Sequence, residues 1–277
     1  MRVGLLVDIN RNNYKDNIRH AKSLGFDCGQ LAIWDMGFYT DEYAKELKAF
    51  LETENFEVSA LWCGWTGPVI WGYPHMYTSL GLVPDYMRQK RMEDLERGAD
   101  FAYALGIDTV VTHIGYTPDN PFDPARLAIV QCLKGLCKKL RDRGQRFAFE
   151  TGEEIPLTLN ILINEIGLDN VGVNFDPANL TSSGRGNAND AMDMLGCRIF
   201  GMHAKDAVPA KFGETSGHQV LIGTGKVDFK RLMCQLKENG FPGDIVIEHE
   251  MSGTADRNAE ILDAKKYLEA IIAEVFG

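Results

Sequence analysis

The chain has 277 residues and is 45% hydrophobic, enough to bury a large core in one domain or in two. It carries 29 basic and 39 acidic residues, a formal net charge of −10, and no long run of Lys or Arg, which argues against a nucleic-acid partner. The segment 1–8 is too short and too soon charged for a signal peptide, no apolar run reaches the roughly 18 residues of a membrane span, and the six cysteines form no C-x-x-C pair. We therefore expect a cytoplasmic protein with free thiols and no membrane partner.

Short apolar runs alternate with stretches of helical periodicity along the whole chain. We expect strands over 3–7, 28–34, 58–62, 109–113, 146–150, 171–176, 199–203 and 244–248. Helices fill most of the intervals: Thr40 is a candidate N-cap for one of them, and another begins near Asp123 with an apolar stripe that includes Leu127. The segment Cys63–Val83 is rich in Gly and Pro and is expected to lack regular structure, and a loop is expected between 203 and 225.

Strict alternation of strands and helices implies a parallel sheet with helical crossovers. Eight such units within one domain's length favour an α/β fold of the (β/α)8 TIM barrel type, with residues 1–277 as a single domain. An open doubly wound sheet is the alternative. It would show a glycine-rich turn after the first strand, and the sequence there is Asp8-Ile9-Asn10-Arg11.

Four consecutive strands end in residues that can bind a metal or move a proton. These residues are Glu150, Asp176, His203 and Glu248. In a barrel of this type the carboxyl ends of the strands surround one shared mouth. A solvated loop residue would explain any single one of them, but four in succession favour a divalent-metal site with one nitrogen and several carboxylate ligands.

The motifs around these positions resemble those of the xylose isomerase-like TIM barrels. The resemblance rests on Asn174-Phe175-Asp176-Pro177-Ala178-Asn179, Met202-His203-Ala204-Lys205-Asp206, Ile222-Gly223-Thr224-Gly225-Lys226-Val227-Asp228 and Ile247-Glu248-His249-Glu250. It covers essentially the whole chain and is specific for the superfamily but weak for the substrate. It implies that Glu150, Asp176, His203 and Glu248 bind one divalent metal ion and that Glu150 and Glu248 also act as catalytic acid and base.

The chemistry implied is isomerisation or epimerisation of a small sugar or a related polyol or keto compound. Removal of a proton next to a carbonyl creates an enediolate, whose charge a metal can stabilise as a Lewis acid while a carboxylate moves the proton. Return of the proton to the opposite face gives an epimer, and transfer to the adjacent carbon gives an isomer; the sequence leaves both open. The ion is Mn²⁺, Co²⁺, Zn²⁺ or Mg²⁺, and the nitrogen ligand His203 favours the first three.

Five further residues near the strand ends are predicted to contact the carbohydrate substrate. They are His113, Asn179, Lys205, Trp62 and Glu153. Structural roles remain alternatives for three of them: a structural histidine at His113, an ion pair with the loop at Lys205, and a solvated or supporting carboxylate at Glu153, as at Glu154. Arg185 is the only suggestive candidate for holding a substrate phosphate.

All four tryptophans lie at or just after the second and third strands, at positions 34, 62, 65 and 71. They are expected to form an apolar wall over a sugar-sized ligand, which would exclude water from a reactive intermediate. A subunit interface in a homo-oligomer is the alternative, because aromatic residues are enriched at interfaces.

Two other functions stay open at this stage. The first is a metal-dependent phosphodiester hydrolase of the endonuclease IV type, which is disfavoured because Asn179 and Trp62 stand where extra histidines would be needed. The second is a dehydratase, or a ligand-binding barrel without catalysis, on the same scaffold.

Overall fold

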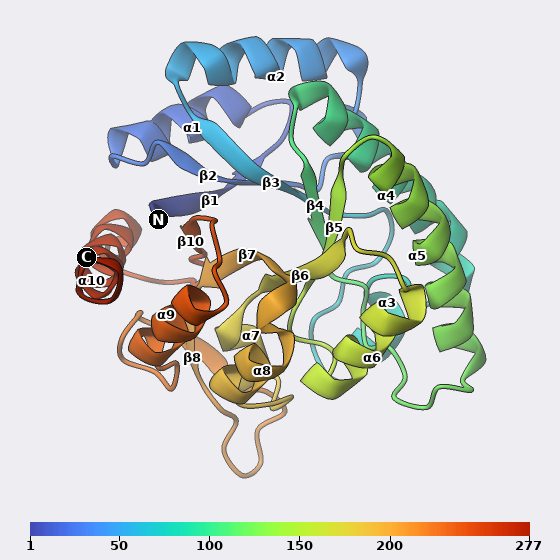
Figure 1. The fold of residues 1–277 in the computed structure, drawn as a ribbon. Coiled ribbons are helices and arrows are strands. Elements are labelled where there is room, and N and C mark those ends of the chain that lie inside the picture. The colour runs from blue at the N-terminus through green and yellow to red at the C-terminus, as the bar shows by residue number, and fades with distance from the viewer.

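Eight parallel strands close into a barrel in the computed structural model, which describes residues 1–277 (Figure 1). The barrel strands are β1 (Val3–Ile9), β2 (Cys28–Ile33), β3 (Glu57–Cys63), β4 (Thr109–Thr112), β5 (Arg146–Glu150), β6 (Val171–Phe175), β7 (Ile199–Ala204) and β10 (Ile245–Ile247). β1 pairs with both β2 and β10, which closes the sheet. The predicted single-domain (β/α)8 barrel is therefore confirmed.

Helices surround the barrel on its outside (Figure 1). They are α1 (Tyr14–Ser23), α2 (Asp41–Glu54), α4 (Asp85–Leu105), α5 (Pro124–Asp142), α6 (Pro156–Ile166), α8 (Ala188–Leu195), α9 (Phe229–Glu238) and α10 (Arg257–Phe276). The shorter α3 (Met76–Ser79) and α7 (Pro177–Ser182) lie in loops that follow strands, and two 3₁₀ turns span Met36–Phe38 and Gly196–Arg198. Thr40 caps α2 as predicted, since its Oγ1 accepts a hydrogen bond from the amide of Tyr43 at 3.3 Å.

Most of the core is one continuous cluster of 64 buried apolar residues between the strands and the surrounding helices. A smaller cluster of seven residues contains Trp62 together with Ala32, Val111 and Ala148. The parallel register places these four side by side on β2, β3, β4 and β5. Because two of its neighbours are alanines, the large indole has room at this level of the barrel.

Three local predictions were wrong. The segment Cys63–Val83 contains one helical turn, α3, and the connection after β7 contains an antiparallel hairpin formed by β8 (Asp206–Val208) and β9 (His218–Val220). Leu127 is 53% exposed rather than part of the buried stripe of α5. The buried face of α5 begins at Arg126 instead. The other buried positions of the helix recur at helical spacing from it: 129, 130, 133, 136, 137 and 140.

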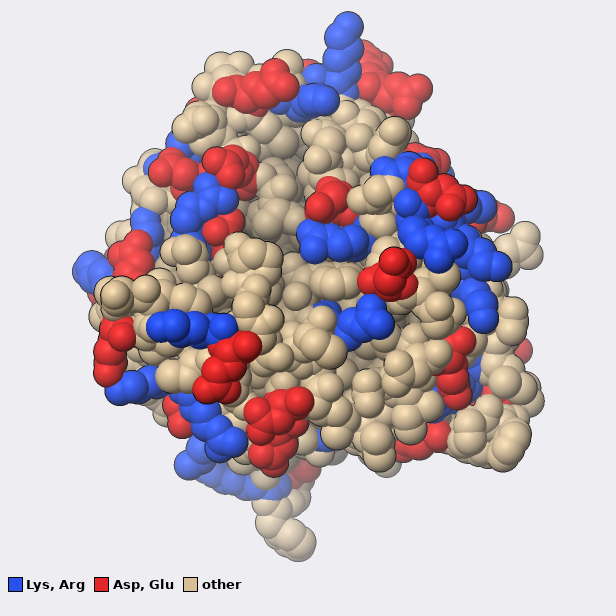
Figure 2. Space-filling model, viewed as in Figure 1, with Lys and Arg blue, Asp and Glu red and all other residues tan.

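Acidic and basic side chains are interspersed over the face shown in Figure 2. None of the helices combines the length and the apolar character that crossing a bilayer requires.

Candidate metal centre and substrate cavity

The structure brings the four strand-end residues together at one point. Glu150 ends β5, Asp176 follows β6, His203 lies near the end of β7 and Glu248 follows β10. These strands are neighbours in the barrel, in the order β5-β6-β7-β10. Each residue offers one ligand atom, and the four atoms lie within 4.8 Å of one another. The group could therefore hold a metal ion.

Gln30 and Asn174 orient His203, which is fully buried. The Nε2 atom of His203 lies 2.9 Å from the side-chain oxygen of Gln30, and the amide nitrogen of Gln30 donates to Asn174 Oδ1 at 2.8 Å. A proton on Nε2 donates to the Gln30 oxygen, with Asn174 Nδ2 3.0 Å away, and leaves a lone pair on Nδ1. Nδ1 faces the carboxylates, 2.9 Å from Glu150 Oε1 and 3.2 Å from Glu248 Oε2.

In two of the carboxylates, one oxygen accepts a hydrogen bond from the surrounding protein and the other does not. Asp176 Oδ1 accepts the amide of Asn179 at 2.8 Å, at the start of α7, and Asn174 donates to Glu150 Oε2. The remaining Asp176 Oδ2, Glu150 Oε1 and His203 Nδ1 are buried and make no hydrogen bond of good geometry, and Nδ1 and Oε1 face each other at 2.9 Å. Because buried polar atoms are nearly always paired, three orphans around one point fit a bound cation. The donor set, one nitrogen among carboxylates, suits a divalent metal.

The charges around His203 favour a cation at this point. Burial lowers the pKa of His203, but the nearby carboxylates of Glu150, Glu248 and Asp176 raise it well above its usual range. A proton on the imidazole balances only part of their charge. A divalent ion balances more of it, which gives the donor set a physical reason to bind one.

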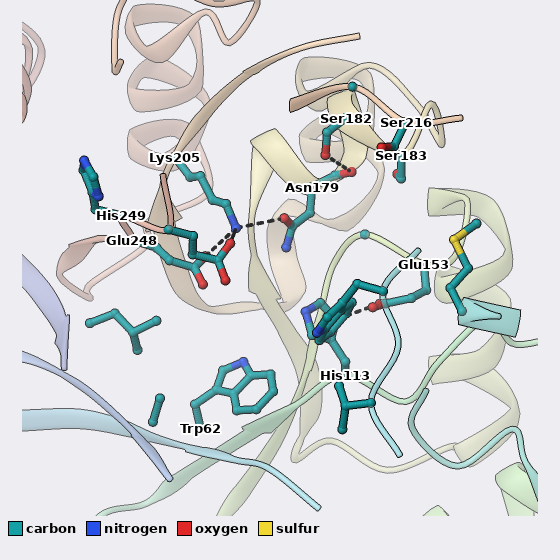
Figure 3. A pocket seen from close by; sticks show the side chains of 18 of the residues that line it. Trp62, His113, Glu153, Asn179, Ser182, Ser183, Lys205, Ser216, Glu248 and His249 are labelled. Atoms are coloured by element: carbon teal, nitrogen blue, oxygen red, sulfur yellow. Dashed lines mark hydrogen bonds and ion pairs between the residues drawn. The ribbon is translucent and has the colours of Figure 1, made fainter. Parts of the chain in front are cut away.

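Lys205 is a buried, fully paired cation beside the same cluster. Its Nζ lies 3.1 Å from Asn179 Oδ1, 3.1 Å from Glu248 Oε2 and 3.7 Å from Asp176 Oδ2, and it also contacts Glu250 (Figure 3). Burial lowers the pKa of Lys205, but Glu248, Asp176 and Glu250 raise it well above its usual range. Lys205 therefore stays protonated and cannot serve as a base.

Asp206, the residue after Lys205, does not pair with it: the carboxylate partners of Lys205 are Glu248, Asp176 and Glu250. Its carboxylate accepts the amides of Gly223 at 2.9 Å, Gly225 at 2.8 Å and Val227 at 3.1 Å. The glycine-containing segment is thus a tight turn held by a buried carboxylate. Asp206 is a structural residue of the loop after β7.

A cavity of about 580 Å³ opens beside the four candidate ligands. Glu248 lines it, as do all five residues predicted to contact substrate: His113, Asn179, Lys205, Trp62 and Glu153 (Figure 3). Trp34 and Trp71 also line the cavity, whereas Trp65 is buried and packs behind the wall, with ring centroids 5.0 Å from Trp34 and 6.1 Å from Trp62. Three of the four tryptophans therefore form an apolar wall of the cavity.

His113 and Glu153 form a buried pair on the cavity wall. Glu153 Oε2 lies 2.7 Å from His113 Nδ1, and the ring of His113 stands edge-on to Trp71 at 5.2 Å. Burial lowers the pKa of His113, but the charge of Glu153 and its hydrogen bond raise the pKa to about 9. At neutral pH His113 is therefore an imidazolium that can donate its second proton into the cavity.

Glu153 and Glu154 are not solvated, contrary to one of the predicted alternatives. They are 4% and 3% exposed. Glu153 Oε2 accepts a hydrogen bond from His113 Nδ1, and Glu154 Oε1 accepts one from the hydroxyl of Thr117 at 2.8 Å. Burial and the charge of Glu153 raise the pKa of Glu154 to about 8. Because each of these two carboxyl groups accepts a hydrogen bond from a specific donor, the free-energy cost of burying it is reduced.

The His113–Glu153 pair predicts that the free energy of unfolding depends on pH. The folded pKa of His113, about 9, is above the unfolded value of 6.5, so its contribution is complete below pH 6.5 and is lost as the pH rises through 9. The raised pKa of Glu154 acts in the same direction. At pH 6 the wild type should exceed Glu153→Gln by about 3 kcal/mol in free energy of unfolding. At pH 10, where His113 is neutral and Glu153 repels Glu154, this advantage should be lost or reversed.

Denaturant unfolding in the presence of a chelator measures both differences. Glu54→Gln is the control, since Glu54 pairs with Arg19 at the surface and should contribute no more than about 1 kcal/mol. An equal deficit of Glu153→Gln at pH 6 and pH 10 would show that the pair does not titrate as described.

Gln30 and Asn174 were not among the site residues predicted from the sequence. Each is a polar residue inside an otherwise apolar strand, in Cys28–Ile33 and Val171–Phe175, and that position was an available signal. A fully buried amide on a barrel strand requires partners, and a strand-end histidine is one of the few groups within reach.

The chain is similar to a known protein family over most of its length. A model of the family described as xylose isomerase-like TIM barrel matches residues 18–271. L-ribulose-5-phosphate 3-epimerase UlaE of Shigella boydii is 26% identical over 269 residues, which cover 94% of this chain and 90% of that protein. The uncharacterized protein MJ1311 of Methanocaldococcus jannaschii is 26% identical over 200 residues, which cover 68% of this chain and 66% of that protein, just under two thirds.

A solved structure shares the fold over nearly the full length. The xylose isomerase domain protein from Planctomyces limnophilus superposes with a TM-score of 0.91 at 25% identity and covers 99% of this chain and 98% of that chain. Together with the family match over 18–271, this similarity settles the family: the chain belongs to the xylose isomerase-like TIM barrels.

Proposed function

We propose that this protein is a divalent-metal-dependent epimerase or isomerase of a small sugar or a related keto compound. The observation that carries the proposal is the set of three orphaned, buried ligand atoms on Glu150, Asp176 and His203, which together with Glu248 stand beside a cavity large enough for a sugar. The similarity to a sugar-phosphate 3-epimerase supports it. These four residues would hold the ion, which supplies, when bound, a Lewis acid for negative charge that develops on the substrate's oxygens.

Glu248 and Glu150 are proposed to move the proton. Glu248 is the more accessible of the two, with a side chain 13% exposed, and it lines the cavity. The hydrogen bond from Lys205 Nζ, 3.1 Å long, holds the Glu248 carboxylate in place. β6 and β7 separate the strands that carry the two glutamates, so the carboxylates approach the centre from different sides. One can therefore remove a carbon-bound proton and the other return it.

The remaining cavity residues are proposed to bind and shield the substrate. His113, charged by its pairing with Glu153, donates a hydrogen bond to a substrate oxygen, and Asn179 offers its amide from the start of α7. Trp62 and Trp71 supply the apolar wall that excludes water during proton transfer. Glu153 acts through His113 as a positioning residue.

Proton exchange in D₂O tests this function. The Mn²⁺-loaded protein is incubated with ketoses, aldoses, inososes and their phosphates, and NMR follows deuterium at carbons next to the carbonyl. We expect exchange with at least one keto sugar, about one bound metal ion per chain, and loss of exchange on chelation. A protein that binds no metal and exchanges no proton in any of these compounds would refute the proposal.

Gln30 is expected to control metal affinity although it does not touch the ion. Gln30→Leu removes the acceptor for His203 Nε2–H, so the imidazole loses both its orientation and its tautomer. The affinity for Mn²⁺, measured by calorimetric titration, should fall about 10–100-fold. Gln235→Leu is the control, because Gln235 is a buried amide in α9 that bonds Asn189 far from the site. Unchanged affinity in Gln30→Leu would contradict the role assigned to the network.

A further inference from the structure

We propose that Asp8 is a substrate-binding residue whose carboxylate accepts hydrogen bonds from two hydroxyl groups on neighbouring carbons of the substrate. The inference rests on the proposed function, since it names what the same cavity recognises in a sugar. It is carried by the place of Asp8 in the barrel, by the lack of a donor for its carboxylate within the protein, and by the charges around it.

The side chain of Asp8 faces the inside of the barrel. The odd-numbered residues of β1 are buried in the main core cluster, between the strands and the surrounding helices, whereas Leu6 and Asp8 line the cavity. Side chains alternate between the two faces of a strand, so Leu6 and Asp8 share the inner face. Leu6 also packs against the smaller apolar cluster that contains Trp62, which confirms that this face of β1 is directed inward.

The parallel register places Asp8 in one layer with residues of the cavity wall. Asp8 pairs with Ala32 on β2, and Ala32 pairs with Trp62 on β3. Both of these residues line the cavity as well. On its other side β1 pairs with β10, which Glu248 follows. Asp8 therefore stands between the aromatic wall and Glu248, and the small side chain of Ala32 leaves room beside it for a ligand.

No group of the protein donates to the Asp8 carboxylate. The one side chain that bonds this residue, Asn17, donates to its backbone carbonyl at 2.7 Å. The other three acidic residues that line the cavity each accept a hydrogen bond, either from His113 or from Lys205. Asp8 is thus the acidic residue of the cavity wall that has both carboxylate oxygens free.

The surroundings make an unpaired carboxylate costly at this position. Burial and the nearby carboxylates of Glu248 and Glu250 raise the pKa of Asp8, whereas the charge of Arg257 lowers it. Arg257 forms no ion pair with Asp8, and its guanidinium donates to the carbonyl of His249 at 2.9 Å. A local cost without compensation inside the protein is typical of a residue that serves function, and a donor that arrives with the ligand would supply the compensation.

Neighbouring hydroxyl groups match this acceptor. An ionised carboxylate accepts through two oxygens and donates nothing, so it can meet two adjacent hydroxyls of one sugar at once. Lys205 and Arg257 already bring positive charge to this side of the cavity, which favours a neutral donor over a cationic one. Because hydrogen bonds to a charged group are stronger than neutral ones, Asp8 should contribute about 10–100-fold to the affinity for the substrate.

Asp8→Asn tests this role with the D-ketohexoses as probes: D-fructose, D-psicose, D-tagatose and D-sorbose. They share one carbonyl position and cover every arrangement of the hydroxyls at C3 and C4. Binding to the Mn²⁺-loaded protein is read from tryptophan fluorescence, because three tryptophans line the cavity. We expect the variant to bind the tightest of these sugars about 10–100-fold more weakly and to discriminate less among them. Its affinity for Mn²⁺ should change by less than about fivefold, since Asp8 is not one of the four candidate ligands.

Asp16→Asn is the control for loss of one negative charge. Asp16 is exposed on α1, the helix that follows β1, and it does not line the cavity, so this variant should bind all the ketohexoses as the wild type does. An affinity of Asp8→Asn that falls no further than that of Asp16→Asn would overturn the inference. Binding of none of the ketohexoses to the wild type would overturn it as well.

Stability separates a binding role from a structural one. Because Asp8 has no donor and stands near two carboxylates, Asp8→Asn should unfold, in the presence of a chelator, at the denaturant concentration of the wild type or at a higher one. Asp94→Asn is the contrasting variant: buried Asp94 accepts from the amide of Thr66 at 2.9 Å and from Lys90 at 2.9 Å, so its midpoint should fall. A lower midpoint in Asp8→Asn would show that its carboxylate supports the fold instead.

Kinetics keep the inference distinct from the proposed function. On a keto sugar that exchanges its proton, Asp8→Asn should raise KM by about 10–100-fold and lower kcat much less. Exchange with an unchanged KM would leave the function standing and remove the role of Asp8. Weaker binding of the ketohexoses by Asp8→Asn, with no exchange in any keto compound by the wild type, would remove the function and leave Asp8 as a residue that binds sugar hydroxyls.

Discussion

Glu248→Gln and Glu150→Gln should each lower the rate of carbon-bound proton exchange by about 10²–10⁴-fold. An amide has nearly the shape of the carboxylate but cannot accept the proton at neutral pH. In Glu248→Gln the amide still meets the substrate from the cavity wall, so substrate binding should change much less than the rate. Glu150 is fully buried, and its free Oε1 points at the same centre, so its substitution should also weaken metal binding.

NMR exchange rates at saturating Mn²⁺ separate the two effects. Calorimetric titration gives the metal affinity of each variant, so the rate can be compared at equal metal occupancy. Glu269→Gln is the control for loss of one negative charge, because Glu269 is a half-exposed residue of α10. If both site variants kept full turnover on a substrate that the wild type uses, the assignment of the acid and the base would be wrong.

Arg91→Met should lower the free energy of unfolding by about 3–5 kcal/mol and loosen the aromatic wall of the cavity. The guanidinium of Arg91, on α4, is fully buried and donates to four backbone carbonyls of the segment 66–81. These contacts are Nε to Thr66 at 3.1 Å, Nη1 to Ser79 at 2.8 Å and to Gly81 at 2.6 Å, and Nη2 to Pro68 at 2.9 Å. The substitution leaves these carbonyls unpaired, at a cost of about 1–3 kcal/mol for each one that water does not reach.

Denaturant unfolding and substrate kinetics test Arg91 together. Because Trp71 and Met76 lie on the segment that Arg91 holds, the variant should also raise KM more than it lowers kcat. Arg97→Met is the matched control: Arg97 lies on the same helix, is exposed and bonds the carbonyls of Met36 and Tyr39, so its loss should cost about 1 kcal/mol or less. Arg91→Lys should be intermediate, since an ammonium cannot reach four carbonyls at once. A change below 1 kcal/mol for Arg91→Met would contradict the anchoring role.

Local pattern was sufficient to predict the barrel and the residues at its strand ends. Parallel strands buried on both faces show as continuous apolar runs, and the helices between them show as a 3.6-residue repeat, so eight alternating units could be counted. Glu150, Asp176, His203 and Glu248 each stand directly at the end of such a run. Their convergence follows from the topology, because all strands of a parallel barrel end at the same rim.

The contacts that complete the site depended on tertiary structure. Gln30 meets Asn174 across 144 positions of the chain, and His113 meets Glu153 across 40. No local propensity encodes such pairs, since each partner is selected by the register of strands far apart in sequence. Burial follows the same logic: Glu153 sits in a loop whose composition indicates exposure, and only the packing of neighbouring loops encloses it.

The sequence by itself determined the fold, the family and the four candidate ligands, because these follow from periodicity and from short motifs within single strands. Only the tertiary structure decided which ligand atoms are free, how large the cavity is and which residues line it. Those properties depend on distances between side chains of different strands and loops. The closing of the barrel sets those distances, and no single segment contains them.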